Sequence, residues 1–268
     1  LVEQGRIGLD DPAEKYLPEL VGLKVIESFD AVTGAYQVRP AARAPTVKHF
    51  LTHTSGLAYP FTSAIWRDFK PRAGETYPFG GPLLFDPGER WEYGSNIDWA
   101  GQVVEGVTGQ RLGEVMQERI FAPLGMADTG FFITPSMHQR GADGSLTALN
   151  ELELTQEPEV HMGGHGLYST VGDYCRFIRM WLNDGAGEGG RVLKRETVLL
   201  AEKNGLGDKK IKGLPGVIPS LSNDAEFFPG MSKSWACAWP APASTVTAAT
   251  SKAKARIIFV LAKSSNRW

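Results

Sequence analysis

The amino-acid sequence predicts a mixed α/β fold in one large domain. With 268 residues and 42% hydrophobic content the chain can bury a sizeable core, and it contains no repeat and no domain linker. Two segments, 96–109 and 166–185, carry apolar residues at helical spacing. A third segment, 255–262, is β-branched and aromatic on both faces, which is typical of a buried strand. We therefore expect helices packed with strands in a single domain over residues 1–268.

Residues 166–185 give the clearest helical pattern. Thr170 followed by Asp173 is typical of a capping box, and Gly185 is a helix stop. The apolar positions form one stripe, and Cys175 lies on its side of the helix, where we expect a small core residue. The stripe consists of Tyr174, Phe177, Ile178, Trp181 and Leu182.

A second amphipathic helix is expected from Asn96 to a stop at Gly109. Ser95 and Asn96 are its capping candidates, and Tyr93 stands just before it. The inward positions are Ile97, Ala100, Val103, Val104 and Val107.

A shorter helix is predicted within residues 46–57. Thr46 is its expected N-cap and Gly56 its expected end. Its predicted inward residues are Val47, Phe50 and Leu51.

The remaining segments read as one more helix and several loops. Residues 111–121 fit a helix that Pro123 breaks. The segment 58–90, rich in Gly, Pro and aromatics, predicts a long covering loop. Residues 10–22 predict a loop with a short turn, and 133–160 a polar, irregular stretch.

Composition excludes several kinds of partner. The net charge is −2 without a run of like charges, so we expect no nucleic-acid partner and no membrane partner. Lys209, Lys210 and Lys212 read as a solvated loop. No apolar run approaches the roughly 18 residues that span a bilayer. A Gly-rich phosphate loop is absent, and we expect no cofactor.

The first residues, “LVEQGRIGLDDP”, lack a Met and a signal-like segment. Leu1 and Val2 resemble the last apolar positions of a helix that Gly5 ends, so we expect the sequence to start inside a longer protein. Two cysteines require no oxidising compartment. The cytoplasm is slightly favoured because no signal is visible, while the localisation and oligomeric state stay open.

Histidines and a tyrosine are the candidate catalytic groups. The spacing of His161 and His165 would suit a metal on a helix, but two glycines lie between them, so a Gly-rich loop is the preferred interpretation. His53 could act as a base, although local backbone bonding is the simpler interpretation. Tyr93, beside Trp91, would by itself be interpreted as packing. A phenol becomes a useful base only when a cation lowers its pKa from near 10 and a hydroxyl nucleophile lies within reach.

Five ordered blocks of the chain resemble the serine β-lactamase-related family, which includes class C-like β-lactamases, penicillin-binding-protein-like esterases and acyl transferases. The blocks are “LVEQGRIGLDDPAEKYLPEL”, “VKHFLTHTSGL”, “PGERWEYGSNIDWAGQVVEGVTG”, “RIFAPLGMADTGF” and “GGHGLYSTVGDYCRFIRMWLNDG”. The resemblance covers about residues 1–200, and “WEYGSNIDWAG” is most similar to the esterase and transesterase branch. It implies a β-lactamase/transpeptidase-like fold of α+β type: an antiparallel sheet flanked by helices, with a helical and loop subdomain at about 40–165.

The resemblance also implies an acyl-enzyme mechanism on a small-molecule ester or amide. A Ser in an S-x-x-K motif attacks the carbonyl, and the Lys and a Tyr activate it. Tyr93 matches that catalytic tyrosine. The family's substrate-binding Asn lies two residues after the Tyr; here Ser95 holds that position and Asn96 follows.

Two further motifs depart from the family pattern. The S-x-x-K pair is expected just upstream of Leu1, and the match at Ser251 to Lys254 precedes a strand and reads as a chance match. For the third motif the near match is Lys233-Ser234-Trp235, with an indole in place of the Gly. We therefore expect a serine hydrolase or acyl transferase whose isolated chain is inactive. The alternatives are a non-catalytic binding or scaffold protein of the same fold, and a metal hydrolase using His161 and His165.

Overall fold

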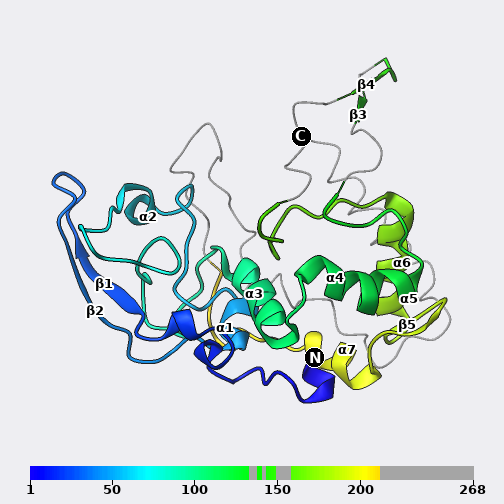
Figure 1. Cartoon of the computed structure of the whole chain (residues 1–268), viewed down its shortest axis with the longest axis horizontal. Helices are drawn as coiled ribbons and strands as arrows, with labels where there is room; N and C mark the ends of the chain where they lie inside the picture. The colour runs from blue at the N-terminus through cyan, green and yellow to red at the C-terminus, as the bar shows by residue number, and fades with distance from the viewer. Residues whose placement is uncertain (133–137, 141–142, 149–157, 212–268) are drawn as a thin grey trace.

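The structure is a computed structural model and describes residues 1–132, 138–140, 143–148 and 158–211 (Figure 1). The strand expected at 255–262, the Ser251–Lys254 match and Lys233-Ser234-Trp235 lie outside these residues. Within the described ranges, β-structure forms three two-stranded antiparallel pairs, and the other elements are helices and turns.

In chain order the elements are the 3₁₀ turns η1 (Val2–Gln4), η2 (Ala13–Lys15) and η3 (Pro18–Leu20), strands β1 (Lys24–Phe29) and β2 (Tyr36–Pro40), helices α1 (Val47–Leu51), α2 (Ala64–Asp68), α3 (Asn96–Thr108) and α4 (Leu112–Met116), the π-type turn η4 (Gln117–Phe121), helix α5 (Ala122–Leu124), strands β3 (His138–Arg140) and β4 (Leu146–Ala148), helix α6 (Val171–Leu182), strands β5 (Ala186–Gly187) and β6 (Gly190–Arg191), and helix α7 (Arg195–Ala201).

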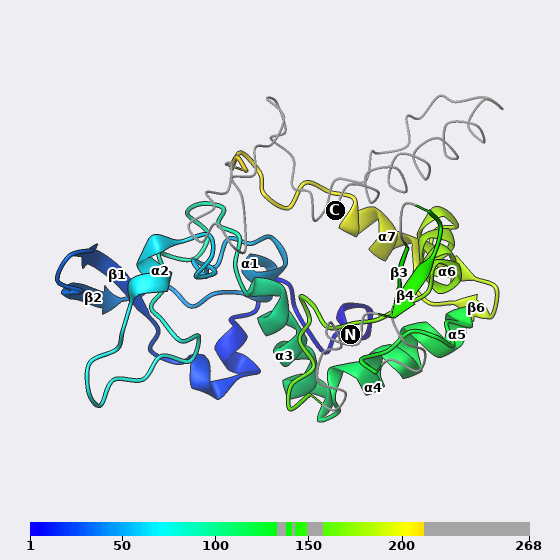
Figure 2. The ribbon, with the colours of Figure 1, turned by 90° about the horizontal axis from the view of Figure 1, so that it is seen from above.

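Helix α3 lies between two groups of elements (Figure 1, Figure 2). The β1–β2 hairpin and α2 lie on one side of it, and α4, α5 and α6 lie on the other. The start of the chain reaches α7, where the Glu3 carboxylate accepts a hydrogen bond from the Lys194 N–H at 2.8 Å. Helix α3 contacts α1 and α4.

The main core lies beneath α1 and α3. Phe50 of α1 and Leu57 are completely buried, and Val103 of α3 is 1% exposed. The close approach of α3 to the start of the chain depends on Gly106, because a Cβ there would stand 2.7 Å from the Tyr16 carbonyl oxygen. The buried members of this core are Ile7, Ala13, Leu17, Leu20, Leu23, Val25, Val47, Phe50, Leu57, Leu83 and Val103.

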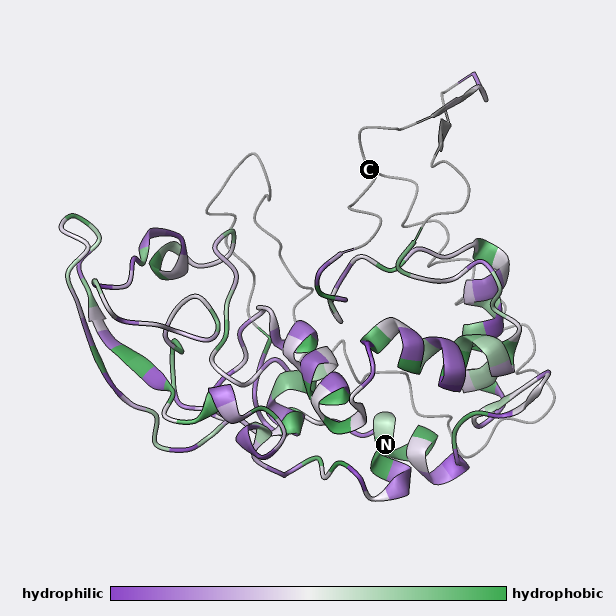
Figure 3. Cartoon of the chain, in the orientation of Figure 1, coloured by the Kyte–Doolittle hydropathy of each residue, from purple (hydrophilic) through white to green (hydrophobic). Residues whose placement is uncertain are grey.

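A second core joins α5 to α6. Leu124 and Met180 are buried, and the half-buried Phe177 and Trp181 pack against them. Helices α4, α5 and α6 show bands of hydrophobic and hydrophilic residues in Figure 3, as expected for helices with one face inward. This second core holds the right-hand group of Figure 1 together.

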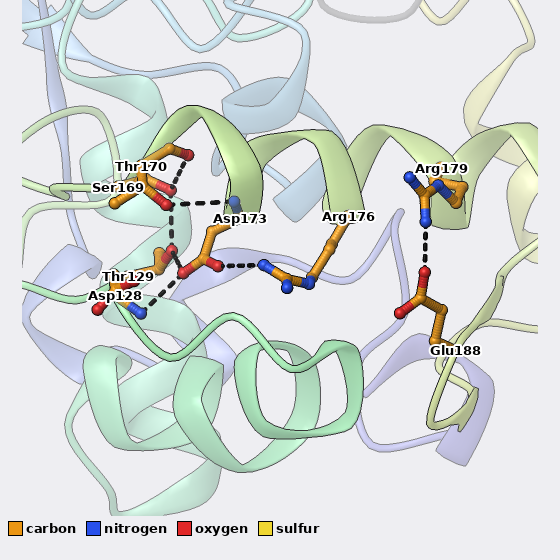
Figure 4. A network of polar contacts seen from close by, with 8 residues as sticks. All are labelled: Asp128, Thr129, Ser169, Thr170, Asp173, Arg176, Arg179 and Glu188. Atoms are coloured by element: carbon orange, nitrogen blue, oxygen red, sulfur yellow. Dashed lines mark hydrogen bonds and ion pairs between the residues drawn. The ribbon is translucent and has the colours of Figure 1, made fainter.

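A buried carboxylate fixes α6 to the segment before it. Asp173 is 1% exposed, and it accepts hydrogen bonds from the Asp128 N–H at 2.8 Å and the Thr129 hydroxyl at 2.9 Å. Its other oxygen binds Arg176 at 2.8 Å, while its own N–H donates to the Thr170 hydroxyl (Figure 4). Asp173 therefore connects two segments rather than closing a reciprocal capping box.

The predicted helices are confirmed at α1, α3, α4 and α6, and Thr46 caps α1 as expected. Some details of the prediction are wrong. Cys175 is exposed, because α6 turns Phe177 and Met180 toward α5 instead. Leu51 is 38% exposed, since α1 already ends there and not at Gly56.

Pro123 does not break the predicted 111–121 helix. The missing N–H of a proline is tolerated in the first turn of a helix, and Pro123 falls in that position of α5, directly after η4. The helix instead ends at Gly125, whose φ of 66° is left-handed. Within the described part of the chain, no helix has the length and apolar content needed to cross a bilayer.

Replacing Asp173 by Ala is expected to lower the free energy of unfolding by about 2–4 kcal/mol, because buried donors lose a charged acceptor. Urea denaturation measures this change. The matched control is Arg179→Ala: Arg179 lies on the same helix as Asp173 and forms an ion pair with Glu188, beyond the end of that helix, but both side chains are more than half exposed. That variant should lose at most about 1 kcal/mol. Equal losses in the two variants would contradict the role of Asp173.

Candidate functional site

Residues 53–56 provide backbone acceptors for the loop that leads to Tyr93. The carbonyl groups of His53, Thr54 and Gly56 accept hydrogen bonds from the N–H groups of Glu92, Gly88 and Leu84 at 2.9, 2.7 and 2.8 Å. We call residues 53–56 the template segment. Since Leu57 and Phe50 on either side of it are completely buried, the template segment is anchored to the core at both ends.

The template segment adopts unusual backbone geometry. His53 has a φ of 54° and Gly56 a φ of 95°, both in the left-handed region. At Gly56 no side chain fits, because a Cβ would stand 2.5 Å from the Phe85 carbonyl oxygen. Histidine is among the residues enriched in this region, though it is uncommon there.

The loop that carries Tyr93 also makes a close backbone contact, at Gly94. A Cβ on Gly94 would stand 2.6 Å from the Ala58 Cα and N and from the Leu57 carbonyl carbon. The glycine therefore lets the Tyr93 loop lie directly on the chain that follows the template segment.

The phenol ring of Tyr93 lies among three other rings. Its centroid is 5.1 Å from that of His53, 5.4 Å from that of Tyr59 and 6.5 Å from that of Trp91. The residue is nevertheless 37% exposed. Packed rings restrict the orientation of the phenol while part of the residue stays open to solvent.

Asn96, predicted to bind substrate, lies beneath this ring cluster. It is completely buried and makes two side-chain hydrogen bonds: its amide donates to His53 Nδ1 at 3.1 Å, and its Oδ1 accepts from the Ser55 hydroxyl. Ser95 begins α3 without a side-chain capping bond. The structure thus brings Tyr93, Ser95 and Asn96 to the start of α3, and it assigns the Asn96 side chain to contacts within the protein.

The second tyrosine of the cluster is bound to a buried carboxylate. Tyr59 donates to Asp98 at 3.0 Å, and the Gly164 N–H donates to the same carboxylate at 2.7 Å. Burial and the Asp98 charge raise the pKa of the Tyr59 phenol. Tyr59 therefore stays protonated at neutral pH, which makes it a hydrogen-bond donor and not a base. Among the described residues, none donates to or accepts from the Tyr93 hydroxyl.

The “HMGGH” segment packs against α3. A Cβ on Gly163 would stand 2.3 Å from the Ile97 carbonyl oxygen, and one on Gly164 would stand 2.8 Å from Asp98. His161 accepts the Gly113 N–H at 3.0 Å, whereas His165 lies 3.9 Å from Asp98. The described residues contain no cluster of three or more His, Cys, Asp or Glu that could hold a metal. The arrangement fits the Gly-rich loop interpretation.

Burial also changes the chemistry of His53. The residue is 8% exposed, and burial lowers the pKa of its imidazole from 6.5 to about 4. The ring is therefore neutral at physiological pH, and Nδ1 accepts the Asn96 amide. The local backbone interpretation of His53 missed this side-chain contact, since Asn96 is distant in sequence.

Tyr59, Asp98 and Ser55 are site residues that sequence reasoning did not single out. Their partners lie 39 to 66 residues away, so no local spacing reveals them. The resemblance in the block “WEYGSNIDWAG” was the signal that pointed to Tyr93, and no comparable motif marks the other three.

The family profile and the fold identify a β-lactamase-type protein. The Beta-lactamase family profile matches residues 1–244, and the chain belongs to that family. The β-lactamase/transpeptidase-like α/β fold expected from the sequence is confirmed by solved structures. The chain is similar to simvastatin synthase from Aspergillus terreus (a LovD6 mutant), with a TM-score of 0.63 and 35% identity over 76% of this chain and 52% of that one.

Two further relatives are esterase or acyltransferase proteins. Lovastatin esterase of Penicillium rubens is 38% identical over 69% of this chain and 51% of its own length. Monacolin J acid methylbutanoyltransferase of Aspergillus terreus is 33% identical over 74% of this chain and 51% of its own. The chain thus spans about half the length of these relatives.

The pKa of His53 predicts a pH-dependent stability. Between pH 6.5 and about 4 the unfolded chain binds a proton at His53 that the native chain does not, so the free energy of unfolding falls as the pH falls through this window. Between pH 7 and 4.5 the loss from His53 should be about 2 kcal/mol. Urea denaturation at both pH values measures this fall in the free energy of unfolding. The fall should be smaller by this amount in His53→Asn, whereas His165→Asn, a change at an exposed position, should show the same fall as the parent chain. Parallel curves for His53→Asn and the parent chain would contradict this assignment.

Gly94→Ala is expected to destabilise the chain by about 1–3 kcal/mol, because its new methyl group collides with backbone atoms. Thermal unfolding measures the change. Gly172→Ala is the control: its Cβ would meet only side-chain atoms at 3.8 Å or more, so we expect no loss of stability. A neutral Gly94→Ala would show that the loop does not depend on this contact.

Proposed function

We propose that the protein is an esterase or acyl transferase that forms an acyl-enzyme, with Tyr93 as its general base. The serine nucleophile and the lysine would come from an S-x-x-K segment preceding Leu1. Tyr93 would be the part of the catalytic machinery that this chain contributes, with Ser95 beside it as a polar contact to substrate.

The observation that carries this proposal is the setting of Tyr93. Its ring is packed against His53, Tyr59 and Trp91, yet the residue is 37% exposed. A catalytic base has to be fixed in orientation and open to the reacting group. Tyr59 fulfils only the first condition, because its hydroxyl is bound to Asp98.

The proposed chemistry is a two-step acyl transfer. Tyr93, deprotonated under the influence of the lysine, takes the proton of the serine hydroxyl as the serine oxygen attacks the ester carbonyl. The tetrahedral intermediate expels the alcohol, which receives the proton from Tyr93, and the acyl group stays on the serine. Water or a second alcohol then attacks the acyl-enzyme, gives its proton to Tyr93 and releases the acid or a new ester; the serine recovers the proton.

The names of the relatives support a substrate class for this proposal. Names such as lovastatin esterase and methylbutanoyltransferase describe proteins that cleave or form esters of small molecules. We extend this to the present protein as a small-molecule ester. We also expect the isolated chain of residues 1–268 to hydrolyse no ester, because a serine hydrolase loses orders of magnitude in rate without its nucleophile.

Kinetics on the longer protein test the role of Tyr93. With the S-x-x-K segment present, turnover of a p-nitrophenyl ester should fall at least about a hundredfold in Tyr93→Phe, the loss typical of a removed general base. Tyr59→Phe is the matched control, with the same atom removed from a neighbouring ring, and should keep much more of the activity. Normal turnover in Tyr93→Phe would exclude it as the base, and reaction of the isolated chain with a fluorophosphonate serine probe would contradict the proposed origin of the nucleophile.

A further inference from the structure

His53 is an unusual residue to find in the core. It is buried, it is polar, and its φ of 54° lies in the left-handed region. Burying a polar ring costs free energy unless it is hydrogen-bonded, and a non-glycine residue in this region adds backbone strain. An apolar side chain could fill the same space without the first of these costs. We therefore expect the His53 side chain to do more than fill space in the core.

A buried chain of hydrogen bonds fixes the imidazole. The Ser55 hydroxyl donates to Asn96 Oδ1, and the Asn96 amide donates to His53 Nδ1 at 3.1 Å. Ser55 and Asn96 are completely buried, so water does not compete for these bonds. Because Nδ1 is the acceptor, the proton of the neutral ring is on Nε2. The plane of the ring is thereby set by Asn96.

The fixed imidazole contacts the proposed catalytic tyrosine. The ring centroids of His53 and Tyr93 are 5.1 Å apart, with 38° between the ring planes. The His53 carbonyl also accepts the Glu92 N–H at 2.9 Å, directly before Tyr93. His53 therefore contacts this region in two ways. Its carbonyl accepts a hydrogen bond from the backbone directly before Tyr93, and its imidazole packs against the Tyr93 ring.

We propose that His53 is a positioning residue for Tyr93, with Asn96 and Ser55 fixing the imidazole against which the phenol packs. The contact selects one orientation of the phenol before substrate arrives, so that no binding energy is used to order it. The consequence for catalysis rests on the proposed function of Tyr93, but the positioning itself does not.

The test is ¹³C-aromatic NMR on the chain of residues 1–268, with the Tyr93 signals assigned by their loss in Tyr93→Phe. Cross-peaks between the Tyr93 and His53 ring protons are expected in the parent chain. His53→Asn keeps an acceptor near the Nδ1 position and tolerates a left-handed backbone, but removes the ring. It should shift the Tyr93 signals. Ser55→Ala, a milder change at the far end of the hydrogen-bond chain, should shift the same signals less.

His161→Asn is the control, because His161 is also a buried histidine with a ring contact, to Phe131, and a hydrogen bond at Nδ1. It should leave the Tyr93 signals in place. Unchanged Tyr93 signals in both His53→Asn and Ser55→Ala would overturn the proposal. So would an equal shift in His161→Asn.

Kinetics on the longer protein separate this proposal from the proposed function. His53→Asn should lower kcat about tenfold with KM nearly unchanged, because a misplaced base affects the chemical step. If Tyr93→Phe keeps full turnover while His53→Asn shifts the Tyr93 signals, the base assignment fails and the positioning role stands. If Tyr93→Phe is inactive and His53→Asn changes neither signals nor kcat, the positioning role fails.

Discussion

The backbone hydrogen bonds between the template segment and the loop that follows residue 83 decide where Tyr93 lies. Each such bond contributes only about 1 kcal/mol net. Their effect comes from their placement, because the template segment begins three residues after the buried Phe50 and is followed directly by the buried Leu57. The segment from 58 to 92, which includes α2, is bonded back to the template segment at Leu84, Gly88 and Glu92. The loop that carries the catalytic candidate Tyr93 is thereby fixed to the core.

Glycines at the start of α3 extend this constraint to the neighbouring segments. Gly94 permits contact with the chain after the template segment, and Gly163 and Gly164 permit contact with the first turn of α3. Side chains at these positions would separate three segments that are far apart in sequence. The compact packing lets Asp98, from α3, reach Tyr59 and Gly164 together. Close backbone contacts at these glycines thus bring the segments of the site together, and the hydrogen bonds between polar side chains depend on those contacts.

The sequence predicted the elements whose signals are local. The helical spacing of α3 and α6, the terminal Gly109 of α3 and the Thr46 cap of α1 depend on residues a few positions apart, and they are confirmed. For α6 the prediction was less exact, because the helix ends with Asn183 as its C-cap before Gly185, and Tyr174 of the predicted stripe is exposed. The β1–β2 hairpin was missed because both faces of β1 are buried: Val25 belongs to the main core, whereas Ile26 packs in a cluster with Tyr36 and Phe69. A bulge at Glu27 further interrupts the alternation typical of a strand.

The site could be predicted only in part. Tyr93 was singled out as a candidate through five ordered blocks that resemble a family, whereas its surroundings depend on contacts across tens of residues. The hydrogen bonds of Asn96 to Ser55 and His53 cross 41 and 43 positions, and no periodicity encodes them. The expected subdomain at 40–165 and the substrate contacts of Ser95 and Asn96 stay predictions.

The proposed catalysis depends most directly on the distance between the Tyr93 hydroxyl and the nucleophile of the longer protein. A crystal structure of that protein, labelled with a fluorophosphonate, measures it. We predict a covalent adduct on the serine of an S-x-x-K segment preceding Leu1, with its Oγ within hydrogen-bond reach of Tyr93 Oη, about 2.6–3.2 Å. An adduct on a serine beyond the reach of Tyr93, or a protein that forms no adduct, would contradict the account.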